Sequence, residues 1–527
     1  MVQEKLQETL KMPVTLETFT LDTGTLSVAA SLNKQARVEV ESAYELWAQS
    51  FDGNYSFKAK DFHYESMVLR QADVQGHFSG KVEDVKVEGK GTVLDAKVQY
   101  KAHIKEEQIK ALEMKMMGVS LLEVLALAGQ APLAKGKVDI DIKMPNIGEK
   151  SAEGYGKIVL HKSLFDRALV KKRYKVSLPK RTYVDAKIEG KLKGEKLNFF
   201  AKLRSNLFSL DLKKASANLE KETLSTAYVL FLKDLGFVTD NQLRGPLEAK
   251  GQIEVEKKKL HLTAKIKARV GNLSLVDVNI DIEKQQMTSP YVLYIPKLEA
   301  LSKRIGKKLY GPLNVEGEVD YNKVLTLKGK STSLGGIVNF TLKDKAFKST
   351  FSALPVEKVL KLLGQKKFVK GKAKGVMTYN LDSRVGKLDA DIKDFQLQAS
   401  SSTNTIKKLI GKDPARIIYT ATTLHADIKG DVTTYALHAK GSHSSIDITE
   451  GLLDKRKNSH SAKFKFVYDK YIFTGKIVGS VDHPKVLLDP SSLMQGKTGE
   501  KIQKNLDKVL GEDVGKAVGG FLKGFKF

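Results

Sequence analysis

The chain has 527 residues, of which 41% are hydrophobic and 28% charged, a composition that supports a large apolar core and argues against wholesale disorder. The net charge is +28, yet only 12 of the 89 basic residues are arginine, which argues against a nucleic-acid-binding protein because such proteins favour the planar arginine side chain. The chain has no cysteine, which excludes disulfides, thiolate metal sites and cysteine nucleophiles and is typical of an oxidising compartment.

The lysines are spread evenly among apolar residues, a pattern typical of a solvated polar face. The alternative is attraction to an anionic membrane surface. Residues Met1–Lys11 predict a charged helical turn or two rather than the apolar segment of a signal peptide. The most apolar stretch, Gly118–Ala134, is too short to cross a bilayer and contains Glu123. We therefore expect either a cytosolic protein or one from which a membrane anchor has been removed.

Apolar and polar residues alternate with a period of two along much of the chain, which predicts strands with one apolar and one wet face. The clearest predicted strands are residues 94–104, 184–192, 260–270, 276–283, 313–319 and 424–430. These runs are longer than the about five or six residues of a usual strand. Short turns between them favour an antiparallel meander, the usual arrangement of strands with one wet face.

Short amphipathic helices punctuate the predicted meander, each followed by a strand that begins between glycines. They are predicted at Leu121–Leu127, Tyr228–Leu235, Tyr294–Leu309 and Val356–Leu363. Gly245 and Gly311 are 66 residues apart and Gly311 and Gly371 are 60 residues apart, which favours repeat units starting near residues 121, 228, 294 and 356. Chance similarity in a β sequence of low diversity is the alternative.

These patterns predict a mainly β protein, an elongated antiparallel repeat β-groove with short interspersed amphipathic helices and C-terminal helices. The predicted helices are too few to cover the apolar face of every strand, so the sheet is expected to curl like a gutter over residues 1–490. Residues 491–527 have helical spacing and predict either an interfacial membrane helix or a cap on the last strand edge. The membrane-contact candidates in this tail are Leu510, Val518, Phe521, Leu522 and Phe525.

No sequence motif for catalysis or for binding a cofactor is present, so we expect a non-enzymatic protein with no cofactor and no metal site. His443 and His460 lie in polar segments without a second ligand at metal spacing. The segment Ser442–Ser445, near Asp447, contains nucleophile and base residue types, but the alternation places them along a strand edge.

An apolar stripe of this length has two interpretations. In the first, it is the floor of an open groove that holds phospholipid acyl chains, while lysines at the rim contact phosphate. In the second, it is fully buried between two sheets of a structural or adhesive scaffold that binds no lipid. The candidate groove-lining residues are Leu94, Ala96, Val98, Val184, Ile188, Leu260, Leu262, Ile266, Val278, Ile280, Val315, Leu424 and Ile428.

The segment Gly479–Gly511 resembles the closing segment of the AsmA family, relatives of TamB, in which a strand with a glycine and a Pro-Lys pair precedes helices rich in lysine, glycine and leucine. The matching positions are Gly479, Pro484, Lys485, Val486 and Asp489. Leu354–Leu397 also resembles the repeat of that family.

This resemblance implies a groove in the periplasm of a Gram-negative bacterium, with an inner-membrane anchor that this chain lacks. It implies phospholipid movement between the inner and outer membranes, a role in outer-membrane biogenesis, and partner proteins in either membrane.

Overall fold

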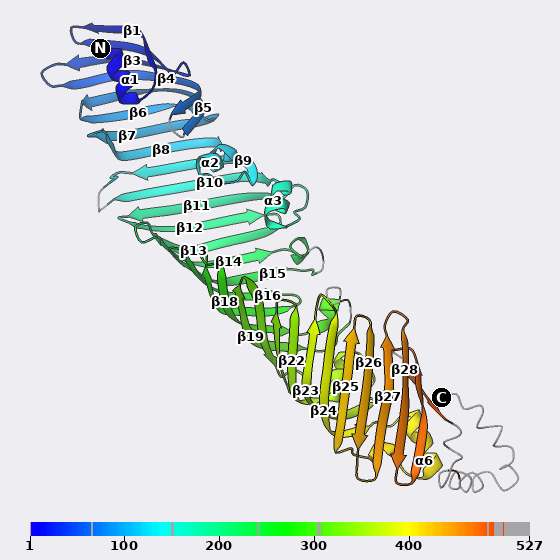
Figure 1. The fold of residues 1–527 in the computed structure, drawn as a ribbon. Helices are drawn as coiled ribbons and strands as arrows, with labels where there is room; N and C mark the ends of the chain where they lie inside the picture. The colour runs from blue at the N-terminus through cyan, green and yellow to red at the C-terminus, as the bar shows by residue number, and fades with distance from the viewer. Residues whose placement is uncertain are drawn as a thin grey trace. The chain divides into compact units, whose positions relative to one another are not determined.

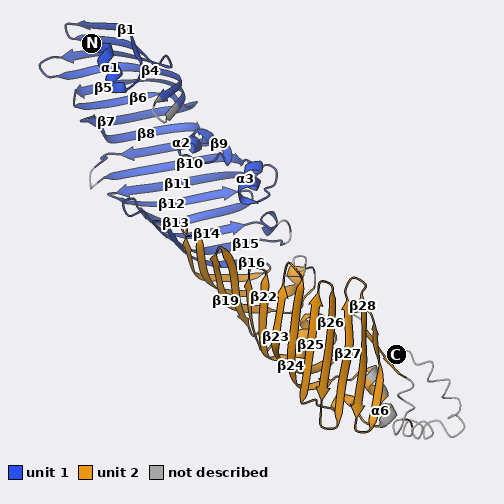
Figure 2. Cartoon of the chain, in the orientation of Figure 1, with its two compact units in different colours: residues 1–269 blue, residues 270–527 orange. Residues whose placement is uncertain are grey.

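A computed structural model of the chain describes residues 2–64, 67–148, 152–239, 241, 243–302, 306, 308–481, 484–489 and 499. Strands make up 66% of the structure and helices 10%, which confirms the predicted mainly β class. Thirty described strands form an open antiparallel sheet (Figure 1). The chain divides into two compact units, Met1–Arg269 and Val270–Phe527 (Figure 2).

The described part of unit 1 is a meander in which each strand pairs with the next strand in the chain. Its strands are β1 (Val14–Asp22), β2 (Thr25–Leu32), β3 (Ala36–Glu45), β4 (Ser50–Tyr64), β5 (Met67–Lys81), β6 (Asp84–Val93), β7 (Ala96–Lys105), β8 (Gln108–Ser120), β9 (Ala134–Met144), β10 (Glu153–Phe165), β11 (Tyr183–Lys193), β12 (Lys196–Ser205), β13 (Phe208–Asn218), β14 (Thr223–Leu232), β15 (Leu247–Glu256) and β16 (Lys259–Ala268). Its helices are α1 (Val2–Leu10), α2 (Leu121–Leu127), α3 (Arg167–Tyr174) and the 3-10 turn η1 (Leu235–Phe237).

Unit 2 continues the same pattern of pairing between neighbours in the chain. Its strands are β17 (Gly271–Asp281), β18 (Gln286–Ile295), β19 (Leu313–Asn322), β20 (Val324–Ser331), β21 (Ile337–Lys343), β22 (Ala346–Pro355), β23 (Val369–Asn380), β24 (Val385–Leu397), β25 (Ala421–Lys429), β26 (Val432–Lys440), β27 (Ser444–Asp454), β28 (Ser459–Tyr468), β29 (Tyr471–Gly479) and β30 (Pro484–Leu488). Its helices are α5 (Val356–Leu362), α6 (Ser401–Ile410) and the 3-10 turns η2 (Leu298–Leu301) and η3 (Pro414–Arg416).

The predicted strands are confirmed as β7, β11, β16, β17, β19 and β25, with two differences in detail. Leu94 lies outside β7, in a two-residue turn with Asp95, where both residues have positive φ (53° and 61°). Such turns match the twist of paired strands. In β17 a bulge between Leu275 and Asn279 shifts the alternation, so Val276 is 59% exposed.

Of the four predicted helices, two are confirmed, one is wrong and one is described only in part. α2 covers the predicted Leu121–Leu127, and α5 ends one residue before the predicted Leu363. The prediction of a helix at Tyr228–Leu235 is wrong, because the Tyr, Val and Phe residues of this segment favour strand and pair with β13 and β15. In the segment predicted at Tyr294–Leu309, β18 runs to Ile295 and ends before Pro296, and the described residues that follow include η2 and the helical Ser302.

Two helices of the structure were not predicted from the sequence. Asp166 caps α3 by accepting a hydrogen bond from the backbone N of Leu169 at 2.9 Å. The side chain of Ser400 likewise accepts from Thr403 N at the start of α6. None of the described helices is long and apolar enough to cross a membrane. The predicted C-terminal helices, with Leu510, Val518, Phe521, Leu522 and Phe525, lie outside the described residues.

Buried apolar side chains are concentrated where a helix or a turn covers the sheet. In unit 1, Leu94, Ala96 and Val119 form a small cluster against which Val124 of α2 packs. In unit 2 a larger cluster lies under α5 and α6, and its members Tyr419 and Phe473 are fully buried. Elsewhere many large apolar side chains are only half-buried.

Candidate functional site

The thirteen candidate groove-lining residues occupy three kinds of environment. Six are buried: Leu94, Ala96, Val98, Val184, Val278 and Val315. Six are half-buried: Leu260, Leu262, Ile266, Ile280, Leu424 and Ile428. Ile188 is 36% exposed, although its neighbours across the sheet are the apolar Ile158 and Ala201. Leu94 and Ala96 pack in a core cluster, so they are the candidates least suited to contact a ligand.

Unit 2 contains a hollow of about 570 Å³ that is lined almost wholly by apolar side chains. We call it the apolar hollow. Its volume is in the range of small-molecule sites, which is about 300–1,000 Å³. The lining comes from five neighbouring strands, from η2 and from α5. The lining residues are Leu273, Leu275, Tyr291, Leu293, Leu298, Leu301, Leu309, Pro312, Leu313, Val315, Val319, Leu327, Ser331, Ser333, Leu334, Val338, Phe340 and Leu362.

Alternation explains why these side chains meet on one face. Leu273 lies opposite Leu293, and Leu293 lies opposite Val315 on the next strand. Leu275 lies opposite Tyr291 in the same way. Side chains that are paired across antiparallel strands point to the same face, so β17, β18 and β19 contribute one continuous apolar surface.

The polar atoms of the lining are already hydrogen-bonded. The hydroxyl of Tyr291 donates to the carbonyl of Lys328 at 3.0 Å, and burial raises the pKa of this phenol, so it stays neutral. Ser331 Oγ donates to Ser333 Oγ at 3.2 Å, and Ser333 Oγ accepts from the backbone N of Asn314 at 2.6 Å. The hollow therefore offers apolar contact without a charge or an unpaired donor among these residues.

Gly329 on β20 makes room for the aromatic side chains of the hollow. It lies directly opposite Phe340 of β21. A Cβ atom at position 329 would clash with Cζ and Cε1 of Phe340 and would lie 2.8 Å from the hydroxyl oxygen of Tyr291. Because glycine has no side chain, both rings can lie over this strand instead of filling the hollow.

Lysines flank the apolar hollow. Lys297 and Lys308 are exposed and precede the lining residues Leu298 and Leu309 in the chain. In α5, Lys358 reaches over Gly335, next to the lining residue Leu334. An ammonium group on a flexible stem suits contact with phosphate at the edge of an apolar site.

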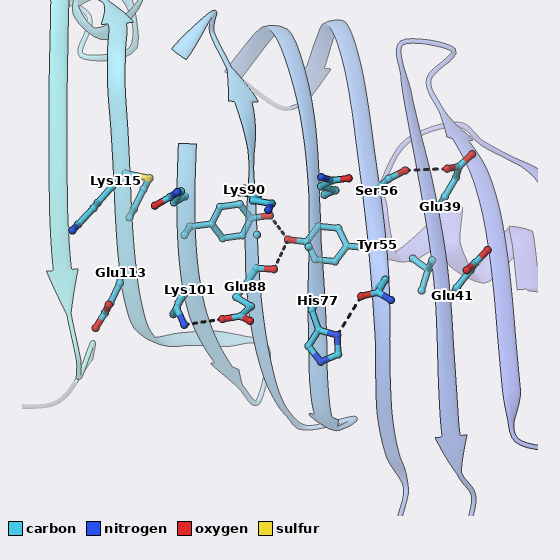
Figure 3. A pocket seen from close by; sticks show the side chains of 18 of the residues that line it. Glu39, Glu41, Tyr55, Ser56, His77, Glu88, Lys90, Lys101, Glu113 and Lys115 are labelled. Atoms are coloured by element: carbon cyan, nitrogen blue, oxygen red, sulfur yellow. Dashed lines mark hydrogen bonds and ion pairs between the residues drawn. The ribbon is translucent and has the colours of Figure 1, made fainter. Parts of the chain in front are cut away.

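Unit 1 has a larger hollow of about 1180 Å³, but its chemistry differs. Most of its lining side chains are charged or polar, as Figure 3 shows for Glu39, Glu88, Lys90 and Lys115. Acids and bases pair within this lining, for example Lys101 with Glu88 at 2.8 Å. The hydrogen bond from Lys101 lowers the pKa of Glu88, so both groups remain charged and occupied with each other.

Two tyrosines from the middle strands, Tyr55 and Tyr100, belong to the same lining. The hydroxyl groups of Tyr55 and Tyr100 are hydrogen-bonded to one another. Gly76 and Gly89 on the two strands between them leave space for the rings, because a Cβ atom at either position would lie 2.6 Å from Tyr55 Oη. Burial raises the pKa of Tyr55, which keeps this phenol neutral. The pair therefore repeats the glycine–aromatic arrangement of the apolar hollow.

Several histidines of the described residues contact one or two carboxylates each, and His425 contacts both Asp389 and Asp427. His438 Nδ1 lies 3.0 Å from Asp447, and His443 Nδ1 lies 3.7 Å from Asp469. Asp447 thus faces a different histidine from the one in the Ser442–Ser445 segment, so no Ser–His–Asp arrangement forms there. The described residues contain no group of three or more acidic or histidine side chains placed to hold a metal ion.

Of the thirteen candidates, only Val315 lines the apolar hollow. The six half-buried candidates lie instead on the apolar faces of β16, β17 and β25. The lining residues Leu273, Leu275 and Leu293 were missed, although Leu273 and Leu275 continue the alternation before the bulge. Leu293 was hidden because the adjacent segment was predicted as a helix.

Comparisons with known proteins do not place the chain in a family. No protein-family model matches it, and no curated protein matches it either.

Proposed function

We propose that the protein is a non-enzymatic lipid-binding protein whose curled apolar face forms a groove for phospholipid acyl chains. The observation that supports this most strongly is the apolar hollow, which combines a volume of about 570 Å³ with an almost wholly apolar lining. Each methylene group that enters it leaves water with a gain of about 0.8 kcal/mol. An acyl chain needs no hydrogen-bond partner, and the lining supplies none.

The size and direction of the hollow fit a long chain. Its lining crosses β17 to β21, and five strands about 4.8 Å apart span roughly 19 Å. The exposed lysines beside Leu298, Leu309 and Leu334 suit a phosphate head group that remains in water. An acyl chain in the hollow and a head group at these lysines account for both features with one ligand.

The alternative is a structural or adhesive scaffold with a fully closed core. A closed core exists in this protein, under α5 and α6, where Tyr419 and Phe473 are 0% exposed. The lining residues Leu273, Leu275 and Leu293 remain half-buried, which favours a surface that a ligand covers.

We further propose that the lipid moves between the inner and outer membranes of a Gram-negative bacterium, in the periplasm, and so supports outer-membrane biogenesis. This rests on the resemblance of Gly479–Gly511 to the closing segment of the AsmA family. In the described part of that segment, Gly479 at the end of β29 pairs with Pro484 at the start of β30. Membrane surfaces and partner proteins in either membrane would complete such a route.

The test is lipid analysis of the purified full chain. Native mass spectrometry of the folded protein should show bound phospholipid, and extraction should identify it. Leu293→Asp places a charge in the apolar hollow and should remove most of this lipid while circular dichroism shows an unchanged sheet. Leu381→Asp, at a turn position that is 49% exposed, is the matched control and should keep its lipid. Absence of lipid from the wild type, or equal lipid in both variants, would overturn the proposal.

A further inference from the structure

The tip of the hairpin between β3 and β4 exposes two large apolar side chains. Trp47, the only tryptophan of the chain, is 99% exposed, and the adjacent Leu46 is 71% exposed. Few soluble surfaces leave a tryptophan wholly in water, because its ring gains more than most side chains from leaving water. The indole also has one polar N–H group, so its preferred environment is the boundary between an apolar and an aqueous phase.

The strands beneath this tip hold it in place. The rings of Tyr44 and Phe51 lie across the base of the hairpin with centroids 6.5 Å apart. The backbone N of Tyr44 donates to the carbonyl of Gly24 at 2.9 Å, and the Tyr44 hydroxyl donates to the carbonyl of Asp22 at 3.0 Å. The hairpin is therefore fastened to the preceding turn, and the exposure of Trp47 belongs to an ordered element.

Other exposed apolar side chains lie on the same edge of the sheet. Turns that lead from an odd to an even strand lie on one edge of the meander, opposite the edge that carries α2 and α3 (Figure 1). At this edge Leu21 is 59% exposed, Val82 67% and Ile109 48%. The hairpin tip is therefore the most prominent member of an apolar row along this edge.

The charged residues beside this apolar row determine which kind of membrane surface it can contact. Acidic residues lie next to its apolar ones, at Asp22, Glu45, Glu83, Glu106 and Glu107. An anionic membrane would repel these carboxylates, whereas a surface of zwitterionic head groups would not. Lys81, Lys105 and Lys110 lie among these carboxylates, which outnumber them.

We propose that the Leu46–Trp47 tip inserts into the interfacial layer of a lipid bilayer rich in zwitterionic head groups and anchors unit 1 to it. This goes beyond the proposed function, because a protein that carries no lipid in the apolar hollow can still dock in this way. A protein that carries lipid there needs such a contact to meet the membrane.

The single tryptophan makes the test direct. Vesicles of phosphatidylcholine should shift the fluorescence emission of the full chain to shorter wavelength, and brominated phosphatidylcholine should quench it. Vesicles rich in phosphatidylglycerol should shift it less. No shift with either vesicle, or a shift only with the anionic one, would overturn the proposal. A shift caused by raising the protein concentration without lipid would also overturn it, because it would show contact between copies of the chain.

A matched pair of variants measures the contribution of the tip. In vesicle co-sedimentation, Trp47→Ala should weaken partitioning by roughly ten-fold, which corresponds to about 1.4 kcal/mol, because the variant loses the burial of a large apolar side chain. Phe368→Ala, which removes an aromatic side chain that is 54% exposed in unit 2, should leave partitioning unchanged. Equal partitioning of the two variants would contradict an anchor at the tip. Trp47→Ala should retain any lipid bound in the apolar hollow, so failure of this inference is distinguishable from failure of the proposed function.

Discussion

Two stretches of unit 2 are built from strands with the same alternation of apolar and polar residues, but their apolar faces are covered to different extents. Over β22 to β29, the helices α5 and α6 cover the apolar face, and Phe395, Tyr419 and Phe473 form a closed core. Over β17 to β21, the same kind of face remains as the apolar hollow. The difference arises from the connections: two helices pack on the first stretch, whereas among the described residues η2 and the end of α5 line the second. The covering elements, rather than the strands, decide whether an apolar face becomes a core or a site.

The largest expected effect is a difference in how much a truncated side chain destabilises unit 2 in each of the two stretches. Phe473→Ala should lower the free energy of unfolding of unit 2 by about 3–5 kcal/mol, because it leaves a cavity beside the stacked ring of Phe466. Leu293→Ala should cost only about 1–2 kcal/mol, because its half-buried side chain leaves no closed cavity. Urea dependence of amide exchange in unit 2 peptides measures both. Equal losses would mean that the hollow is packed like the core.

A second prediction concerns the glycine beneath the hollow. Gly329→Val should push the rings of Phe340 and Tyr291 into the hollow, reduce bound lipid and cost about 1–3 kcal/mol through overpacking. Gly156→Val is the control, because no atom lies within 4 Å of a Cβ at that position. Gly156→Val should leave the free energy of unfolding unchanged or raise it slightly, since valine favours strands. Lipid content by mass spectrometry and urea midpoints give the two readouts, and loss of lipid in both variants would argue against a specific role of Gly329.

A third prediction compares a histidine on the apolar face with one on the charged face. Burial lowers the pKa of His460, which packs on Tyr435, so its contribution to stability is present above about pH 6.5 and is lost as the pH falls through the folded-state pKa. Hydrogen bonds that His425 donates to Asp389 and Asp427 raise the pKa of His425, so its contribution is present below about pH 6.5 and is lost as the pH rises through the folded-state pKa.

Amide exchange of β28 and β25 between pH 5 and 8 should therefore change in opposite directions when His460 and His425 are each replaced by glutamine. His460→Gln should flatten the loss of protection in acid, and His425→Gln should flatten the loss in base. Changes of the same sign would show that the two faces do not differ in this way.

The smallest expected effect is on the charged face. Lys463→Gln removes the ion pair with Glu450, which joins exposed groups at 2.7 Å. It should change the free energy of unfolding by about 0–1 kcal/mol, and less in high salt, because solvent screens exposed pairs. Urea unfolding at low and high salt provides the measurement. A loss as large as that of Phe473→Ala would mean that the charged face, and not the covered core, stabilises unit 2.

The sequence predicted the strands better than the site. Alternation is a local property, so β11 and β19 could be placed from residues such as Val184 and Val315 alone. Whether a face is covered depends on contacts between distant segments, which is why Leu94 was grouped with groove residues although it packs in a core. The apolar hollow also depends on Leu298 in η2 and Leu362 in α5. The alternation within the strands does not predict where either of these side chains lies. The capping residues Asp166 and Ser400 were usable signals for α3 and α6 and were overlooked.

The pairing of each strand with its neighbour in the chain also bears on how the protein is made. A hairpin such as β3–β4 has all its partners within a short stretch of sequence, so it can form as soon as that stretch has left the ribosome. Each new strand then extends an existing edge, and within each unit the sheet can grow in the direction of synthesis. Unpaired edges are sites of misassociation, so during synthesis the newest strand of a growing sheet and the first strand at its opposite edge would need protection from other chains.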